Sequence, residues 1–262
     1  MRNKGIRLLE QLQASGRRVF TVTDARERLG VSRFNSLRIL GNLKRQKRIL
    51  TLTHGLYALW HPSERKWGLR PLPILDSLMN FRKMPYYIGL LSAADYHGAA
   101  HHKPQVLQVV IPKQLSLRKA SQLHISFHVK KKFPIIGLEK VMTESGTVYY
   151  SSPELTALDV IYYQSACAGF GNVCIVVHDL ISHLDGVRLK KMIEEYPYAA
   201  CVQRLGFLME YFGADLKLLK PLQQWVKRKQ LVPVALSPDC PKKGKIHKNW
   251  QVIENAKVET EP

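Results

Sequence analysis

Apolar and polar residues alternate along the first thirty positions with the period of amphipathic helices. Isoleucine and leucines between residues 6 and 12 recur at helical spacing, which predicts a first helix. Thr23 stands where an N-cap is expected, and we predict a second helix over 24–29. Gly30 then supplies a tight turn. Short helices joined by such brief connections are typical of a helix–turn–helix unit.

A third helix is predicted to begin after its N-cap, Ser32, and to end near Gln46. At 100° per residue its apolar side chains fall on one side, which a helix normally turns toward the core. The other side gathers polar residues within an arc of about 100° and carries no acid. The apolar set is Phe34, Leu37, Leu40 and Leu43, and the polar set is Asn35, Arg38, Asn42, Arg45 and Gln46.

Two short apolar runs follow, at 49–52 and 56–59, and they flank Thr53-His54-Gly55. Apolar runs on either side of a turn that contains glycine predict a β-hairpin. A hairpin directly after the third helix completes a winged helix. Such units also serve as protein-binding modules, but the acid-free face of the third helix favours DNA.

The polar face of the third helix carries the residue types that read base edges. Arginine forks onto guanine, and asparagine and glutamine pair with adenine. We therefore assign base readout to Arg33, Asn35, Arg38, Asn42 and Arg45, since the start of a recognition helix lies nearest the bases. We expect the remaining DNA-binding residues to lie along phosphates or the neighbouring minor groove: Ser32, Arg17, Arg18, Lys44, Lys47, Arg48 and the hairpin tip Thr53-His54.

The charge of the chain strengthens this interpretation. Forty Lys and Arg against twenty Asp and Glu leave a net charge of +20 over 262 residues. Residues 1–60 hold 13 of the basic and 3 of the acidic residues, so half of the excess lies in less than a quarter of the chain. Such an excess points to a polyanionic partner, most often nucleic acid and less often an anionic membrane surface. Basic runs farther along the chain fit either solvated loops or phosphate contacts.

We find no apolar run of the roughly 18 residues that span a bilayer, and no export signal at the N-terminus. We therefore expect a cytoplasmic protein with no membrane partner. The four cysteines form no CxxC pair and are expected to be reduced thiols.

Beyond residue 60 the pattern predicts a second, larger domain. Proline and glycine between 61 and 73 indicate a connector. Short strands are predicted first and helices later, without a βαβ rhythm, so the fold class is α+β. The expected division is a winged helix–turn–helix domain at 1–62, a linker at 63–84 and a mixed α+β domain at 85–262. The predicted strands are 86–91, 106–111, 122–129 and 148–150, and the predicted helices are 93–97, one from Pro153, 173–184, 186–195, 198–212 and 216–225. Ser92 and Ser152 are the predicted N-caps of the first two of these helices.

No motif supports catalysis or a cofactor. His97, His101 and His102 form HxxxHH, but Gly98 interrupts the helix that would align them, so a polar loop fits better than a metal site. The glycines near 169–171 lack the third glycine and the preceding strand of a dinucleotide loop. We therefore expect no metal, no cofactor and no enzymatic activity.

The motifs of the chain resemble those of the AbiEi antitoxins of type IV toxin–antitoxin (abortive infection) systems. The resemblance covers most of the length. The segments that carry it are the hairpin end HGLY (54–57), YYIGLLSAADYHG (86–98), SPELTALD (152–159), RLGFLME (204–210) and WQVIEN (250–255). Each segment alone is weak, but their order and spacing are fairly specific.

The resemblance implies a repressor that binds inverted repeats in its own promoter, with a C-terminal domain that antagonises a co-encoded nucleotidyltransferase-type toxin. Antagonism of this type does not require stable contact with the toxin. Glu154, Thr156 and Asp159 are then expected to cap and pack, with Asp159 bonded to backbone or to Arg204. Unlike common family members, this C-terminal domain is strongly basic, which leaves room for a DNA contact there.

Two other functions stay open from the sequence. One is a one-component regulator whose C-terminal domain senses a ligand and which has no toxin partner. The other is a nucleic-acid-processing enzyme that uses its basic surface to hold the substrate.

Overall fold

The computed structural model describes residues 2–66, 68–101, 103–115, 123–143 and 146–259. The chain folds into two compact units that are built from interleaved segments. The first unit comprises 1–86, 105–131 and 140–148, and the second comprises 87–104, 132–139 and 149–262. The expected division at 62 and 84 stays a prediction. The architecture is α+β, as expected.

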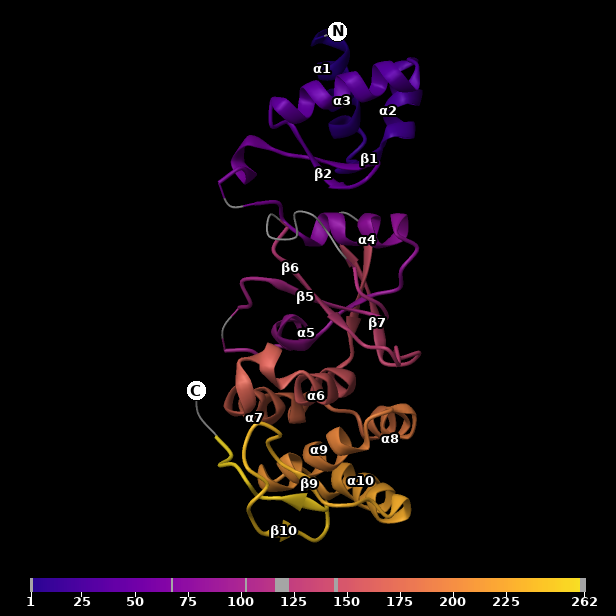
Figure 1. The fold of residues 1–262 in the computed structure, drawn as a ribbon. Coiled ribbons are helices and arrows are strands. Elements are labelled where there is room, and N and C mark those ends of the chain that lie inside the picture. Colours follow the sequence, from indigo (N-terminus) through magenta and orange to yellow (C-terminus); the bar gives the residue numbers. More distant parts are fainter. Residues whose placement is uncertain (1, 67, 102, 116–122, 144–145, 260–262) are drawn as a thin grey trace. The chain divides into compact units, whose positions relative to one another are not determined.

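Three helices and three strands make the winged helix of the first unit. The helices lie on one side of a sheet of order β1-β3-β2, in which both pairings are antiparallel (Figure 1). The order along the chain is α1 (Arg2–Ala14), β1 (Val19–Thr21), α2 (Val22–Leu29), α3 (Arg33–Arg45), β2 (Ile49–Thr53) and β3 (Leu56–Leu59). The predicted helices and hairpin are therefore present.

A single apolar core holds the winged helix together. It packs Leu8 and Leu12 of α1 against Phe20 of β1 and against Ile39 and Leu40 of α3, all of them nearly inaccessible to solvent. Burial of a leucine, isoleucine or phenylalanine side chain stabilises a fold by about 1.5–3 kcal/mol each. This core sets the orientation of α3 and hence of its exposed face.

The start of α2 differs from the expectation. The N-cap is Thr21, and Thr23 lies inside the helix. Thr21 and Asp24 form a capping box: the Thr21 hydroxyl accepts from the Asp24 backbone N–H at 3.1 Å, and the Thr21 backbone N–H donates to the Asp24 carboxylate at 2.8 Å. Gly30 ends α2 in the left-handed conformation at φ 58°, as the turn requires.

The predicted connector contains a helix that the sequence analysis missed, α4 (Leu72–Phe81). It buries Ile74, Leu75 and Leu78 completely. A 3-10 turn at Pro62–Glu64 precedes it. The same unit also contains β5 (Leu107–Ile111) and β6 (Ile125–Val129), which pair in parallel with Leu107 opposite Ile125.

A short strand and a short helix open the second unit. β4 (Tyr87–Ile88) pairs in parallel with β8 (Gly146–Ser151) through Ile88 and Tyr150. β8 and the preceding β7 (Leu138–Thr143), which the sequence analysis missed, each run across a boundary between the units. α5 (Leu90–Tyr96) begins at Leu90 with Gly89 as its N-cap, so the predicted capping role of Ser92 is wrong.

Helices make up most of the second unit, as expected. Ser152 caps α6, and Pro153 occupies its first turn, as predicted. The helices are α6 (Pro153–Tyr162), α7 (Gly169–Leu180), α8 (Gly186–Glu195), α9 (Ala199–Tyr211) and α10 (Leu216–Lys229), followed by the strands β9 (Val234–Ala235), β10 (Ile246–His247) and β11 (Val252–Ile253). α7 begins earlier than predicted, and α10 ends four residues later. Within the described residues, no helix combines the length and the apolar character that a bilayer crossing needs.

Candidate nucleic-acid interface

Helix α3 is rotated about its axis relative to the orientation that we predicted. Its buried side chains are Ser36, Ile39, Leu40 and Leu43. Phe34 is 75% exposed and Leu37 is 43% exposed, so their expected place on the core side is wrong. The helix turns Ile39, which the predicted apolar set left out, into the core in their place. If Ile39 is counted among the apolar residues, the mean direction of the apolar side chains around the helix axis moves away from Phe34.

The predicted base readers divide into two groups. Arg33, Arg38 and Arg45 are exposed. Asn35 and Asn42 are half-buried at the edge of the exposed face, and the Asn42 side-chain oxygen accepts a hydrogen bond from Arg45. The three arginines therefore reach solvent freely, whereas the two amides lie lower on the flank of the helix.

The start of α3 is held by its cap. The Ser32 hydroxyl accepts from the Asn35 backbone N–H at 3.3 Å, as predicted for an N-cap. No carboxylate lies in the sequence of α3, and no ion pair is recorded for its arginines within the described residues. The helix thus presents an uncompensated positive surface.

The residues that we expected along phosphates occupy several places around α3. Lys44, Lys47 and Arg48 are exposed near its C-terminal end. At the hairpin tip His54 is exposed and Thr53 is half-buried. The register between β2 and β3 shifts between Thr51 and Thr53, where the hairpin bends into its tip.

Arg17 and Arg18, between α1 and β1, are already paired with carboxylates. The Arg17 guanidinium lies 2.8 Å from Asp24. Partial burial opposes ionisation of Asp24, but hydrogen bonds from Thr21 and the charge of Arg17 outweigh it and hold the pKa of Asp24 below its usual value. Arg18 donates to both carboxylate oxygens of Glu64 at 2.6 Å, and Glu64 is almost fully buried. Arg18 is therefore less free to meet a phosphate than the exposed cations.

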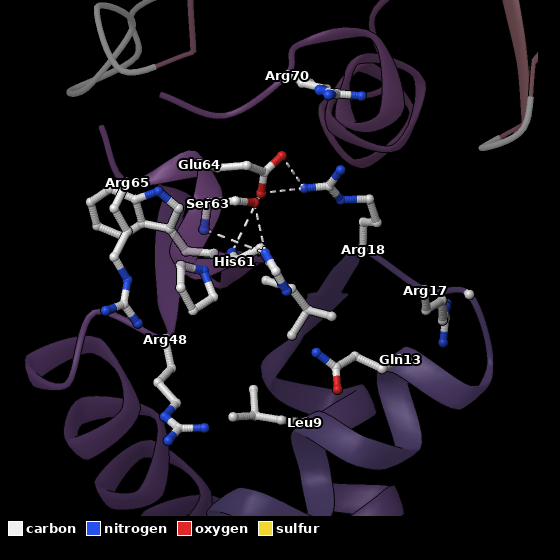
Figure 2. A pocket seen from close by; sticks show the side chains of 14 residues that line it. Leu9, Gln13, Arg17, Arg18, Arg48, His61, Ser63, Glu64, Arg65 and Arg70 are labelled. Carbon is white, nitrogen blue, oxygen red and sulfur yellow. Dashed lines mark hydrogen bonds and ion pairs between the residues drawn. The ribbon is translucent and has the colours of Figure 1, made fainter. Parts of the chain in front are cut away.

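A cavity of about 680 Å³ lies around the Arg18–Glu64 pair (Figure 2). Five arginines line it, and Glu64 is the carboxylate among its lining residues. Two of the five, Arg65 and Arg70, belong to the segment predicted to be a connector. Trp60 also lines the cavity, and its buried indole N–H has no hydrogen-bond acceptor among the described residues. Guanidinium groups suit an anionic ligand.

The histidines do not form a metal site among the described residues. His97 contacts the Ser151 carbonyl oxygen at 2.7 Å, and His101 lies 3.1 Å from the Asp179 carboxylate. His102 falls outside the described residues. His97 and His101 therefore have separate partners.

All four acidic and hydroxyl residues of the SPELTALD segment, Ser152 among them, are buried in the second unit. The Glu154 carboxylate accepts from the Asp185 backbone N–H at 2.9 Å, and Thr156 contacts the Ser151 hydroxyl at 2.7 Å. Asp159 accepts from the Tyr87 and Tyr196 hydroxyls at 2.5 and 2.9 Å. Arg204, a predicted partner of Asp159, instead donates to the Ala235 carbonyl oxygen. These contacts support the structural roles expected of the segment.

Three of the four thiols are buried in the second unit. Burial raises the pKa of Cys167 and of Cys174 to about 12. Cys201 is buried, and Cys240 is half-buried. Among the described residues, none of the four forms a disulfide.

Comparison with known proteins adds a family to this geometry. Residues 7–59 match a family model described as "Transcriptional regulator, AbiEi antitoxin", and residues 87–211 match one described as "AbiEi antitoxin C-terminal domain". A search of curated proteins found no match. The structure is similar to the crystal structure of the RV2827C protein from Mycobacterium tuberculosis, with a TM-score of 0.68, 14% sequence identity, and coverage of 96% of this chain and 91% of that chain. At that identity the similarity concerns the fold alone.

The two matched regions are in the order expected of one antitoxin chain. A transcriptional regulator domain implies DNA binding, and an antitoxin implies a toxin as partner. Neither description is that of an enzyme, which removes the nucleic-acid-processing alternative. The chain belongs to the AbiEi antitoxin family, with an N-terminal transcriptional regulator domain and a C-terminal AbiEi domain.

Proposed function

We propose that the protein represses its own promoter by binding inverted repeats with its winged helix, and that it antagonises a co-encoded nucleotidyltransferase-type toxin in the cytoplasm. The observation that carries the DNA-binding part is the acid-free exposed face of α3 beside a hairpin. A helix of this diameter fits the major groove, where arginine reads guanine.

In this proposal the exposed Arg33, Arg38 and Arg45 read bases, and the half-buried Asn35 and Asn42 reach bases from the edge of the helix face. Ser32 sets the start of the helix. The cations near the end of α3 and the residues of the hairpin tip lie along the phosphates of the DNA backbone. The residues assigned to phosphates are Lys44, Lys47, Arg48, Thr53, His54, Arg17 and Arg18.

The test is binding of the full chain to its upstream region and to a scrambled duplex at about 150 mM salt. We expect a preference of at least about a thousand-fold, the lower end for specific DNA-binding proteins. Equal dissociation constants for the two duplexes would overturn the repressor proposal.

The antitoxin part is tested separately, by expressing the adjacent open reading frame with and without this chain. We expect growth arrest that co-expression relieves, whether or not the two proteins co-purify. A neighbouring frame that is harmless alone would overturn this part and leave the repressor part standing.

The cavity around Arg18 and Glu64 favours a second candidate, a regulator whose promoter binding responds to a small anion. Inorganic pyrophosphate is a suitable first probe, titrated calorimetrically into the full chain. We expect the double variant Arg65→Gln, Arg70→Gln to lose binding, and Arg26→Gln, an exposed arginine of α2 outside the cavity, to retain it. Absence of heat in the wild type, or equal binding by both variants, would argue against a phosphate ligand.

A further inference from the structure

The exposed face of α3 has an apolar centre between two rows of cations. At 100° per residue, Phe34, Leu37 and Gly41 fall within about 60° of one another. Lys44 and Arg33 lie on one flank of this stripe, and Arg38 and Arg45 on the other. Phe34 is 75% exposed and Leu37 is 43% exposed, although the core of the unit is complete without them.

Gly41 continues the stripe without a side chain. A Cβ at this position would meet nothing within 4 Å, so the helix surface is open there. A neighbouring surface can therefore approach the backbone of α3 closely, with Phe34 and Leu37 in contact with it.

A partner for this stripe must offer apolar groups between two lines of negative charge. The major groove of duplex DNA has this arrangement, because thymine 5-methyl groups lie on its floor and phosphates line both edges. A second copy of α3 does not, since its cations would face those of the first copy. An anionic membrane would gain only two apolar side chains, too few for an interfacial helix.

We propose that Phe34 and Leu37 contact thymine 5-methyl groups, so that they select A·T pairs where the first turns of α3 enter the major groove. This inference rests on the proposed DNA-binding function and adds a sequence preference to it. The two residues are separated by about 4.5 Å along the helix axis, close to the 3.4 Å rise of one base step. The contacts therefore fall on neighbouring base pairs, between guanines read by Arg33 and Arg38.

The experiment removes the methyl groups and nothing else. After the operator is located by footprinting, each of its thymines is replaced by deoxyuridine in turn, and the dissociation constant of the full chain is measured. We expect a loss of about three- to five-fold at one or two neighbouring positions, the size expected for one buried methyl group. Uniform affinity for every substituted duplex, with specific binding intact, would overturn the inference while the proposed function stands.

A variant then assigns the contact to a residue. Phe34→Ala should weaken binding to the thymine duplex and leave binding to the deoxyuridine duplex nearly unchanged. The dissociation constant for the deoxyuridine duplex, divided by that for the thymine duplex, should therefore fall to about one. Val187→Ala, which truncates an exposed apolar side chain of α8, is the matched control and should keep the wild-type ratio. A ratio that Phe34→Ala and Leu37→Ala both leave unchanged would overturn the inference.

Other occupants of the stripe give different results. Suppose that the wild type has equal dissociation constants for the thymine and deoxyuridine duplexes, and that Phe34→Ala changes the sedimentation of the free protein or its binding to phosphatidylserine vesicles. The stripe is then a protein or membrane contact, and the inference is wrong. If the wild type shows no preference for its promoter at all, both the proposed function and this inference fail.

Discussion

Individual residues on α3 have distinct expected effects on DNA binding, because in the proposed complex an exposed side chain meets either a base or a phosphate. Arg38 lies halfway along α3, on one flank of its exposed face, whereas Lys44 is the last residue but one of the helix. Base contacts carry sequence information, and phosphate contacts carry affinity without it. Substitutions at these two positions therefore separate specificity from charge.

We expect Arg38→Ala to cost about 1–3 kcal/mol of binding free energy on the operator and to relax sequence preference. Lys44→Ala should weaken specific and random duplexes alike and reduce the slope of log K against log salt by about one. Binding isotherms at several salt concentrations measure both effects. If the two variants behave identically on specific and random DNA, the assignment of roles on α3 is wrong.

Thiol reactivity is another property decided residue by residue. Because burial raises the pKa of Cys167 and Cys174 to about 12, only about one thiol in ten thousand is ionised at pH 8. We expect iodoacetamide at pH 8 to alkylate the half-buried Cys240 first, and the two buried thiols only when the chain unfolds. Peptide mass spectrometry with and without urea measures the order, and fast labelling of Cys174 in the native protein would contradict it.

At the scale of elements, short-range contacts at helix ends determine where the helices of the winged unit begin. The Asp24 carboxylate accepts from the backbone and hydroxyl of Thr21 and pairs with Arg17. It thereby links the start of α2 to the turn before β1. The same carboxylate makes the free energy of unfolding depend on pH, because its pKa lies below its usual value.

We expect Asp24→Asn to lower the free energy of unfolding at pH 7 by about 0.5–2 kcal/mol, the usual cost of a lost cap. A carboxyl group whose folded pKa is depressed stabilises the fold above its unfolded pKa of about 3.9, and this contribution is lost as the pH falls through the folded pKa. The difference between wild type and variant should therefore shrink between pH 5 and pH 2, as urea unfolding would measure. Glu27→Gln, an exposed position on the same helix, is the control and should show no such change.

At the scale of the whole molecule, segments far apart in the chain close the core of the second unit. Trp250 is fully buried, and its indole N–H donates to Glu210 of α9 at 2.5 Å. Its ring lies directly against Gly206, where a Cβ would come within 2.1 Å of it. The C-terminal segment that contains Trp250 is therefore part of the core.

We expect Gly206→Ala to destabilise the protein by about 1–3 kcal/mol, because the added methyl group must displace the Trp250 ring. Gly41→Ala, at a helical glycine with open space around it, should instead raise the free energy of unfolding by about 0.5–1 kcal/mol. Thermal unfolding with tryptophan fluorescence compares the two variants. Equal stability of Gly206→Ala and wild type would show that the ring moves without cost.

The sequence alone was sufficient for the features that depend on neighbours within one or two helical turns. Helix period, the Ser32 and Ser152 caps, the Gly30 turn and the hairpin at 49–59 all follow from residues close together in the chain. The acid-free composition of α3 was likewise readable, and with it the expectation of a winged helix that binds DNA. Even here the cap of α2 was misplaced by two residues, since two threonines compete for the position.

Only the tertiary structure decided which face of α3 reaches solvent and which cations are already paired. The rotation of α3 depends on how Ile39 and Ser36 pack against other elements, and the pairing of Arg18 depends on Glu64, 46 residues away. Asp159 likewise meets Tyr87 across 72 residues. Helical period and capping act over about four residues, whereas burial and pairing depend on the whole folded chain. The exposure of Phe34 and the arginine-lined cavity are therefore visible only in the tertiary structure.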